Sequence, residues 1–245
     1  MRIVVIGATS AIAEHCCREW LGQGPADLLL VARDIAKAQR IAQDLAVRSP
    51  TSTIEVATVD FLDPGAIDAL AGRAAENPID IVLIAHGVLP PQATLQDDLV
   101  KCRDTLAINA LSPALFAEAF AARLARAGRG TIAIIGSVAG DRGRKSNYVY
   151  GSAKGLLARY AEGMQHRFAG SGVAVVLVKP GPTDTPMAQT HRAAGLKLAA
   201  VEDVARDTVK GIAARRPVVY TPGRWALIML VVRHIPRFVF NRLNI

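Results

Sequence analysis

The chain of 245 residues is 51% hydrophobic and 20% charged, which is enough for one large domain with a sizeable core and excludes a disordered chain. Its three cysteines, two of them adjacent, exclude a disulfide scaffold and lack the paired spacing of a zinc site. No apolar run approaches the roughly 18 to 20 residues of a membrane-spanning helix, and no secretory cleavage site follows the N-terminus. These features predict a soluble or peripheral protein of a reducing, cytoplasmic compartment.

The net charge of +8 is concentrated near the C-terminus. Residues 208–245 hold seven of the 29 Lys and Arg side chains and none of the 21 Asp and Glu side chains. The rest of the chain is therefore close to neutral, whereas a nucleic-acid-binding domain would carry a basic face across its surface. We expect no nucleic acid as a partner, and the basic tail needs a local explanation.

Apolar runs of strand length alternate along the chain with segments of helical periodicity. Strands are predicted over 2–6, 27–32, 53–59, 79–85, 130–135 and 173–178, and helices over 11–21, 35–47, 64–75, 98–127 and 150–169. Continuous apolar strands that alternate with helices indicate a parallel sheet covered on both faces. The predicted fold class is therefore α/β, a single doubly wound Rossmann-like parallel sheet with helices on both faces.

The turn after the first strand is built from small residues, as in turns that bring backbone amides to a pyrophosphate at a helix N-terminus. It reads Gly7-Ala8-Thr9-Ser10-Ala11-Ile12-Ala13. Of the three glycines expected in such a turn only Gly7 is present, and Ala11 and Ala13 occupy the other two positions. An ordinary tight turn therefore remains the alternative.

The next two strand ends carry residues suited to a bound nucleotide. The second strand closes with Ala32, where NAD-binding chains usually place a carboxylate, and Arg33 follows, which suits a 2′-phosphate. This favours NADP(H) and leaves NAD(H) open, because Arg33 could instead cap the next helix or pair with Asp34, which would then take the carboxylate role. Asp60 and Phe61 follow the third strand, where an adenine would lie.

The most specific pattern is a tyrosine and a lysine four residues apart, preceded by a serine at a strand end. Tyr150 and Lys154 share one helix face, where the ammonium would lower the pKa of the tyrosine and make its phenol an acid or base near neutrality. Ser137 ends the preceding strand and could hydrogen-bond a carbonyl oxygen. Tyr148 has Ser152 four residues later instead of a lysine, so we predict no role for it.

Together these patterns resemble the short-chain dehydrogenase/reductase family over essentially the whole chain. The matching residues are the turn at 7–13, Asp60, Asn109, Ser137, Tyr150 with Lys154, and the segment 179–185. The resemblance implies that Tyr150 donates a proton to a substrate carbonyl, which Ser137 polarises. It also implies that Lys154 holds the nicotinamide ribose and lowers the pKa of Tyr150, and that Asn109 anchors a water. The implied cofactor site, with no metal, consists of Gly7, Thr9, Ser10, Ala11, Ile12, Arg33, Asp60, Phe61, Ala85, His86, Gly87, Tyr150, Lys154, Pro180, Thr183 and Thr185.

Two departures from the family pattern concern the cofactor region. One is the glycine-poor turn after the first strand. In the other, Ile84-Ala85-His86-Gly87 replaces the family's Asn-Asn-Ala-Gly, which removes the usual polar brace of the central sheet. His86 lies either near the nicotinamide or substrate or, like most single histidines at strand ends, packed inside the fold. Both departures bear on cofactor affinity and local rigidity rather than on the chemistry.

Two stretches, 140–150 and 232–238, are similar to the decaprenylphosphoryl-2-keto-ribose reductases of this family. This similarity implies NAD(P)H-dependent reduction of the 2-keto sugar of a polyprenyl-phosphate-linked pentose, the second step in forming decaprenylphosphoryl arabinose. It also implies an upstream flavin-dependent oxidase as a partner, and a homo-oligomer. The alternatives are another bulky lipid-like ketone, such as a 3-oxoacyl thioester, and a non-catalytic partner subunit, against which the intact Asn109, Ser137, Tyr150 and Lys154 argue.

The basic tail combines eight apolar residues at 225–232 with Arg233 and Arg237. The run is too short to span a membrane but suits its interface, where arginines reach lipid phosphates. A core or dimer helix with a solvated basic end is the alternative. We assign residues 1–215 to a dinucleotide-binding catalytic domain and 216–245 to a basic, apolar extension of it, which on the first interpretation binds the inner face of the cell membrane.

A cluster of basic residues lies just before Tyr150 in the sequence. It consists of Arg142, Arg144 and Lys145. These side chains either form a solvated loop or contact the phosphate of a substrate.

Overall fold

The structure, a computed structural model, describes residues 1–188 and 197–243. Within these residues the chain forms a seven-stranded parallel sheet in the order β3-β2-β1-β4-β5-β6-β7. The strands are β1 (Arg2–Ile6), β2 (Asp27–Val31), β3 (Thr53–Ala57), β4 (Ile81–Ile84), β5 (Gly130–Ile135), β6 (Val173–Pro180) and β7 (Val218–Thr221). The order reverses direction between β1 and β4, as in a doubly wound sheet, so the predicted fold class is confirmed.

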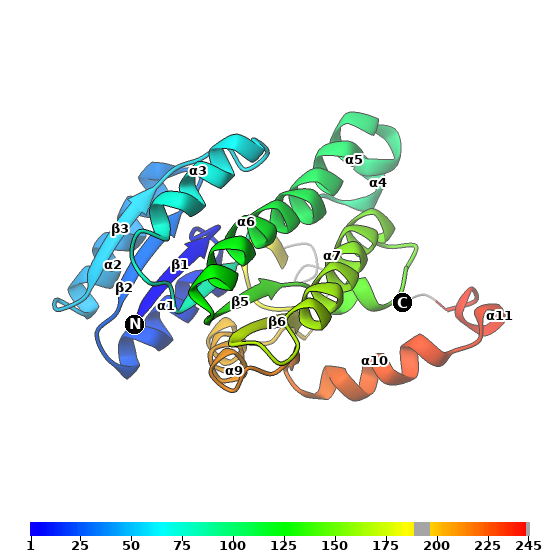
Figure 1. Cartoon of the computed structure of the whole chain (residues 1–245). Helices are drawn as coiled ribbons and strands as arrows, with labels where there is room; N and C mark the ends of the chain where they lie inside the picture. Colours follow the sequence, from blue (N-terminus) through cyan, green and yellow to red (C-terminus); the bar gives the residue numbers. More distant parts are fainter. Residues whose placement is uncertain (189–196, 244–245) are drawn as a thin grey trace.

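Helices cover both faces of this sheet (Figure 1). They are α1 (Ala11–Gln23), α2 (Ile35–Arg48), α3 (Pro64–Ala74), α4 (Gln92–Asp97), α5 (Leu99–Leu106), α6 (Ser112–Ala127), α7 (Tyr148–Arg167), α9 (Val201–Ala213), α10 (Arg224–His234) and α11 (Arg237–Phe240), with short turns η1 (Ala107–Leu111), η2 (Val138–Asp141) and η3 (Pro186–Ala188). Each face has its own apolar layer. One layer packs α3, α6 and α7 against the sheet and contains Phe116 and Phe120, and the other packs α1, α2 and α9 and contains Trp20.

The sequences of the central strands are unbroken apolar runs because both faces of these strands are buried. Ile3, Val4, Val5 and Ile6 of β1 are all fully buried, and they alternate between the two apolar layers. Cys16 and Cys17 are also buried, in the apolar layer of α1, where they pack as small core residues. Because the strands are parallel, their carboxyl ends meet at one edge, which is where the loops predicted to bind a nucleotide come together.

The long helix predicted over 98–127 is interrupted by the π-helical turn η1 at Ala107–Leu111. Pro113 follows in the first turn of α6 and has no amide to donate to residue 109, so the regular ladder of hydrogen bonds cannot continue there. This turn contains Asn109, one of the predicted site residues.

The helical stretch Leu99–Ala127 is long and apolar enough to cross a membrane by length and composition, which differs from the sequence expectation. Half of its most apolar window is buried inside the domain. Phe116, Phe120 and Leu124 are the large side chains that it packs against the sheet. Core helices pass the same test of length and composition, and this packing is that of a core helix.

Three elements of the structure were not predicted from the sequence. They are α4, α9 and the last strand β7, which pairs with β6. The chain leaves the sheet only after β7, so the segment outside it begins at Arg224 with α10. In Figure 1, α10 and α11 extend away from the body of the sheet, beyond β6 and α7.

Candidate active site

A cavity of about 780 Å³ lies at the carboxyl ends of the strands. All of the side chains predicted for catalysis or cofactor binding line it. They come from the turn between β1 and α1 (Gly7, Thr9, Ser10, Ala11, Ile12), from the ends of β2 (Arg33), β3 (Asp60, Phe61), β4 (Ala85, His86, Gly87) and β5 (Ser137), from η1 (Asn109), from α7 (Tyr150, Lys154) and from the end of β6 (Pro180, Thr183, Thr185). The fold thus brings together residues that are up to 178 positions apart in the sequence.

The turn between β1 and α1 fits a phosphate group. Gly7 has φ +82°, and a Cβ there would lie 2.6 Å from the backbone nitrogen of His86, so both the conformation and the close approach require glycine. Ser10 precedes α1 without a side-chain capping bond, which leaves its hydroxyl and the first amides of the helix free of such a partner. A helix N-terminus of this kind attracts the phosphates of a dinucleotide.

Two cations lie at the end of β2, together with a carboxylate that already accepts a backbone hydrogen bond. The Asp34 side chain accepts a hydrogen bond from the Lys37 amide at 2.9 Å and thereby caps α2. No ion pair between Arg33 and Asp34 occurs in the described part of the chain, so the predicted alternative of such a pair is not what the structure adopts. Lys37, like Arg33, lines the cavity. The sequence prediction did not include Lys37, although it follows Arg33 by only four residues.

His86 is a packed side chain, which was one of its two predicted roles. Its Nε2 is 2.9 Å from Ser112 Oγ, and its ring lies edge-on to the rings of Phe61 and Phe116. Burial lowers the pKa of His86 to about 3, so the imidazole is neutral at physiological pH. Phe61 is only 5% exposed within this cluster and forms part of the cavity wall.

Asn109 braces the segment that follows β4. Its Nδ2 donates to the carbonyls of Thr105 and Val88, both at 2.9 Å, and its Oδ1 accepts from the Val88 amide at 3.0 Å. Both amide hydrogens and the amide oxygen are therefore bonded to backbone groups, and the implied role of Asn109 in anchoring a water stays a prediction. This pairing, together with the His86 contact to Ser112, supplies polar bonds where the sequence predicted that a brace was missing.

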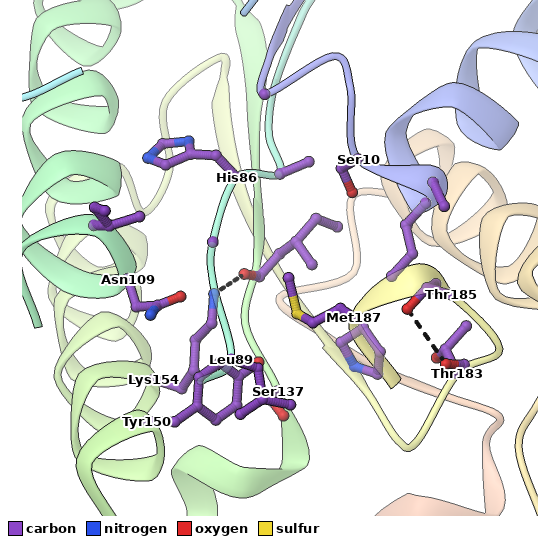
Figure 2. Close-up of a pocket in the computed structure, with 18 of the residues that line it drawn as sticks. Ser10, His86, Leu89, Asn109, Ser137, Tyr150, Lys154, Thr183, Thr185 and Met187 are labelled. Atoms are coloured by element: carbon purple, nitrogen blue, oxygen red, sulfur yellow. Dashed lines mark hydrogen bonds between the residues drawn. The ribbon is translucent and has the colours of Figure 1, made fainter. Parts of the chain in front are cut away.

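Tyr150, Ser137 and Lys154 lie together at one end of the cavity (Figure 2). The Lys154 ammonium is buried, donates to the carbonyl of Ile135 at 2.9 Å, and lies 5.8 Å from the centre of the Tyr150 ring. Ser137 Oγ accepts from the Ala139 amide, which holds the hydroxyl at the start of η2. Tyr150 and Ser137 can thus act on one carbonyl oxygen placed between them, with the Lys154 ammonium beside the Tyr150 ring.

The prediction that the pKa of Tyr150 is lowered is wrong for this structure. Burial of the phenol raises its pKa, and a hydrogen bond with Ser137 only partly opposes this effect. Burial also lowers the pKa of Lys154 to about 8, so the cation that was expected to favour the phenolate is itself weakened. Desolvation, which the four-residue spacing does not reveal, is the dominant effect.

The three basic residues of the cluster at 142–145 lie in different surroundings. Arg142 Nη1 donates to the carbonyls of Val232 at 2.7 Å and Ile235 at 2.6 Å, and its guanidinium lies over the Phe240 ring. It therefore holds the end of α10 and, in the described structure, does not line the cavity, a role that the sequence analysis did not predict. Arg144 lines the cavity, while Lys145 is exposed.

The remaining walls of the cavity include side chains that sequence reasoning missed. These are Leu89, Asn147, Met187 and Lys37. Arg144, for which the sequence predicted either a solvated loop or a substrate contact, also lines the cavity. Figure 2 shows Leu89 near Tyr150 and Met187 near Thr183 and Thr185. Leu89, Asn147, Met187 and Lys37 each lie within four residues of a predicted site residue, but none of them belongs to the motif that identified it.

Comparisons with known proteins agree with this geometry. The family model described as short chain dehydrogenase matches residues 1–195. An uncharacterized oxidoreductase of Mycobacterium tuberculosis strain H37Rv is 32% identical over 98% of this chain and 96% of its own, and one of Streptomyces coelicolor is 31% identical over 98% and 95%. A short-chain dehydrogenase from Sphingobium yanoikuyae in complex with NADPH superposes with a TM-score of 0.84 at 23% identity, covering 100% of this chain and 97% of that one. The chain therefore belongs to the short-chain dehydrogenase/reductase family of oxidoreductases.

Proposed function

We propose that this protein reduces the 2-keto group of a polyprenyl-phosphate-linked pentose with NADP(H), with NAD(H) as the alternative cofactor. The observation that carries the proposal is the position of α10, a largely exposed apolar helix that packs against two walls of the cavity. The lipid of the substrate would lie along this helix while its ketone reaches Tyr150. We place the protein in the cytoplasm, at the inner face of the cell membrane.

In the proposed reaction, Tyr150 donates its phenolic proton to the carbonyl oxygen of the substrate. Its raised pKa keeps the phenol protonated at neutral pH, as a proton donor requires. The Ser137 hydroxyl hydrogen-bonds the same oxygen, and the Lys154 ammonium stabilises the phenolate that is left behind and holds the nicotinamide ribose. A bound nicotinamide cofactor supplies the hydride that the carbonyl carbon accepts.

The pKa of Lys154 leads to an expected pH dependence. Because burial lowers this pKa to about 8 from its ordinary 10.5, the ammonium loses its charge as the pH rises through about 8. We expect kcat/KM for ketone reduction to be retained below that pH and to fall above it. A pH profile at saturating NADPH measures this limb, and Lys154→Arg, which stays charged, should move it upward. A rate that stays level to pH 10 in the wild type would contradict the role of Lys154.

The residues at the end of β2 support NADP(H). Arg33 and Lys37 border the cavity, while the one nearby carboxylate of this turn, that of Asp34, caps α2. Two cations without a free carboxylate suit a 2′-phosphate better than a bare ribose. The related structure from Sphingobium yanoikuyae holds NADPH, in agreement with this choice.

The exposed side of α10 supports contact with a lipid surface. Leu227, Leu230 and Val231 are 67%, 49% and 59% exposed, whereas Met229 is buried against the body of the domain. Apolar residues left in water on a short helix, with arginines at both of its ends, are typical of an interfacial helix. We propose that the extension predicted over 216–245 acts through the part that leaves the sheet, from Arg224 onward.

The buried side of α10 connects that surface to the active site. A Cβ at Gly181 would overlap the Trp225 indole, so the helix packs directly on this part of the cavity wall. Farther along, the Met229 sulfur is 3.9 Å from the guanidinium of Arg144, which also lines the cavity. Arg142 then fastens the end of the helix. A lipid held on α10 would therefore lie next to the reaction site.

Reversing the charge at Arg233 and Arg237 tests this surface. Each basic residue near an anionic membrane contributes about 1 kcal/mol through a field that salt screens. We expect the double change to Glu to reduce sedimentation with anionic vesicles by about tenfold or more and to lower turnover of a long-chain substrate. A soluble short-chain analogue should be reduced as before.

The matched control is Arg40→Glu with Arg73→Glu, which makes the same change of charge at exposed positions of α2 and α3. It should leave vesicle binding nearly unchanged. Wild-type protein that stays in the supernatant at low salt would contradict the membrane interpretation. A fall in melting temperature or a dissociated oligomer, with vesicle binding intact, would instead identify α10 as a packed or dimer helix.

Two partners are part of the proposal. Leu99, Leu115 and Leu156, on α5, α6 and α7, are exposed apolar side chains, and their exposure supports a homo-oligomer. The ketone itself must come from oxidation of a secondary alcohol of the sugar, a reaction that an upstream flavin-dependent oxidase would supply. A substrate panel with a 3-oxoacyl thioester beside the lipid-linked keto-pentose separates this function from reduction of another bulky ketone.

A further inference from the structure

The segment between η2 and α7 places two polar side chains on the wall of the cavity next to the reacting groups. Arg144 and Asn147 both line the cavity. They belong to one turn, in which the Asn147 amide donates to the Arg144 carbonyl at 3.2 Å, and the Asn147 carbonyl in turn accepts from Gly151 in the first turn of α7. Tyr150 precedes that glycine, so the turn and the phenol are linked through the start of the same helix.

Both side chains lack hydrogen-bond partners that their burial would require. Arg144 Nε and Asn147 Oδ1 are buried without a partner among the described residues. The contacts that Arg144 does make are long, 3.5 Å from Nη2 to the Val138 carbonyl and 3.9 Å to the Met229 sulfur. Contacts of this length contribute little, so the guanidinium keeps most of its hydrogen-bonding capacity.

The guanidinium of Arg144 also has no ion-pair partner among the described residues. Within residues 1–188 and 197–243, no carboxylate lies at ion-pair distance from its guanidinium. Asp141, three residues earlier, is already used, because its two carboxylate oxygens accept from Lys179 at 2.5 Å and from the Tyr220 hydroxyl at 2.7 Å. Burying a cation that has no ion-pair partner costs free energy. A ligand that brings an anionic group to the guanidinium would reduce this cost.

We propose that Arg144 and Asn147 form a substrate subsite for a sugar phosphodiester. Arg144 binds the anionic phosphate oxygens, for which a guanidinium has matching geometry, and Asn147 Oδ1 accepts a hydrogen bond from a sugar hydroxyl. The inference rests on the proposed function in that the cavity takes a carbonyl substrate at Tyr150, and it adds which residues select the anionic sugar. It requires no lipid chain, so a soluble sugar phosphodiester suffices to test it.

The test compares two soluble ketones, of which only one carries the anionic phosphodiester. One is a 2-keto pentose carrying a methyl phosphodiester at C1, and the other is its neutral methyl glycoside. We expect Arg144→Met to lower kcat/KM for the phosphodiester by about ten- to a hundredfold, as loss of a charged hydrogen bond does, and to change the neutral ketone by less than about threefold. Arg144→Lys should recover part of the loss because it restores the charge without the planar fork.

The control is Lys145→Met, which removes a cation from the neighbouring exposed position. It should leave both ketones unaffected, and NADPH affinity should be the same in all variants, since Arg33 and not Arg144 is assigned to the 2′-phosphate. Equal losses with both ketones would show that Arg144 only supports the fold, and no loss with either would also overturn the proposal.

A binding measurement keeps this inference separate from the proposed reaction. Calorimetry with pentofuranosyl methyl phosphate and the NADP⁺-loaded protein should show binding that Arg144→Met weakens about tenfold or more. If this holds but no lipid-linked keto-pentose is reduced, the subsite stands and the proposed substrate fails. If the lipid-linked substrate is reduced while Arg144→Met binds the phosphodiester like wild type, the subsite is refuted and the proposed function stands.

Discussion

Replacing Tyr150 by phenylalanine is expected to slow ketone reduction by about 10²- to 10⁴-fold, the usual contribution of a general acid. The substitution removes only the hydroxyl, so the ring keeps its position on α7 beside Ser137 and Lys154. The loss should therefore appear in kcat, while NADPH affinity stays within a factor of about three. Stopped-flow or steady-state oxidation of NADPH measures the first, and quenching of protein fluorescence by NADPH measures the second.

Tyr148→Phe is the matched control for this experiment. Tyr148 lies in the same first turn of α7, is 42% exposed, and does not line the cavity in the described structure. We expect its variant to turn over like wild type. If Tyr150→Phe retained a rate within a few-fold of wild type, another group would have to donate the proton.

Arg33→Ala is expected to weaken NADPH binding by about ten- to a hundredfold and to leave NADH binding nearly unchanged. Removing one charged hydrogen bond to a phosphate has an effect of this size. The two cofactors differ only in the 2′-phosphate, so their difference isolates the contact of Arg33 from the rest of the site. Fluorescence titration of both nucleotides against the wild type and the variant measures it.

Arg40→Ala, at an exposed position of α2 away from the cavity, controls for the general loss of positive charge. It should not change the ratio of the two affinities. Equal weakening of NADPH and NADH by Arg33→Ala, or a wild-type preference for NADH, would contradict the assignment of NADP(H). In that case Asp34 would have to leave its capping position to hold the ribose.

The alternation of apolar strands and helices was sufficient to predict the sheet and six of its seven strands. It missed β7, a four-residue edge strand in which the buried Val219 and Thr221 alternate with the more exposed Val218 and Tyr220, so that neither side is a long apolar run. It also missed α9, although Val201, Val204, Ala205, Thr208 and Val209 repeat at the spacing of a buried helix face. The π-helical turn at Asn109 could not be predicted from periodicity, since it depends on the missing amide of Pro113.

The candidate site was predicted well where a motif fixes both residue type and element. Tyr150 with Lys154, Ser137 and the turn at Gly7 all reach the same cavity because parallel strands end at one edge. Properties that depend on burial could not be predicted, and the direction of the pKa shift of Tyr150 is the main example. The contacts of Arg142 with α10, about 90 residues away in the sequence, could not be predicted either.

The most direct test of the proposed function is turnover of a lipid-linked 2-keto pentose by the purified protein. The substrate, a polyprenyl phosphodiester of the keto-sugar in anionic vesicles, is supplied with NADPH, and the product is identified by mass spectrometry and by the configuration at C2. We predict oxidation of one NADPH per sugar reduced, with loss of activity in Tyr150→Phe. Absence of this product, together with efficient reduction of a 3-oxoacyl thioester under the same conditions, would contradict the proposal.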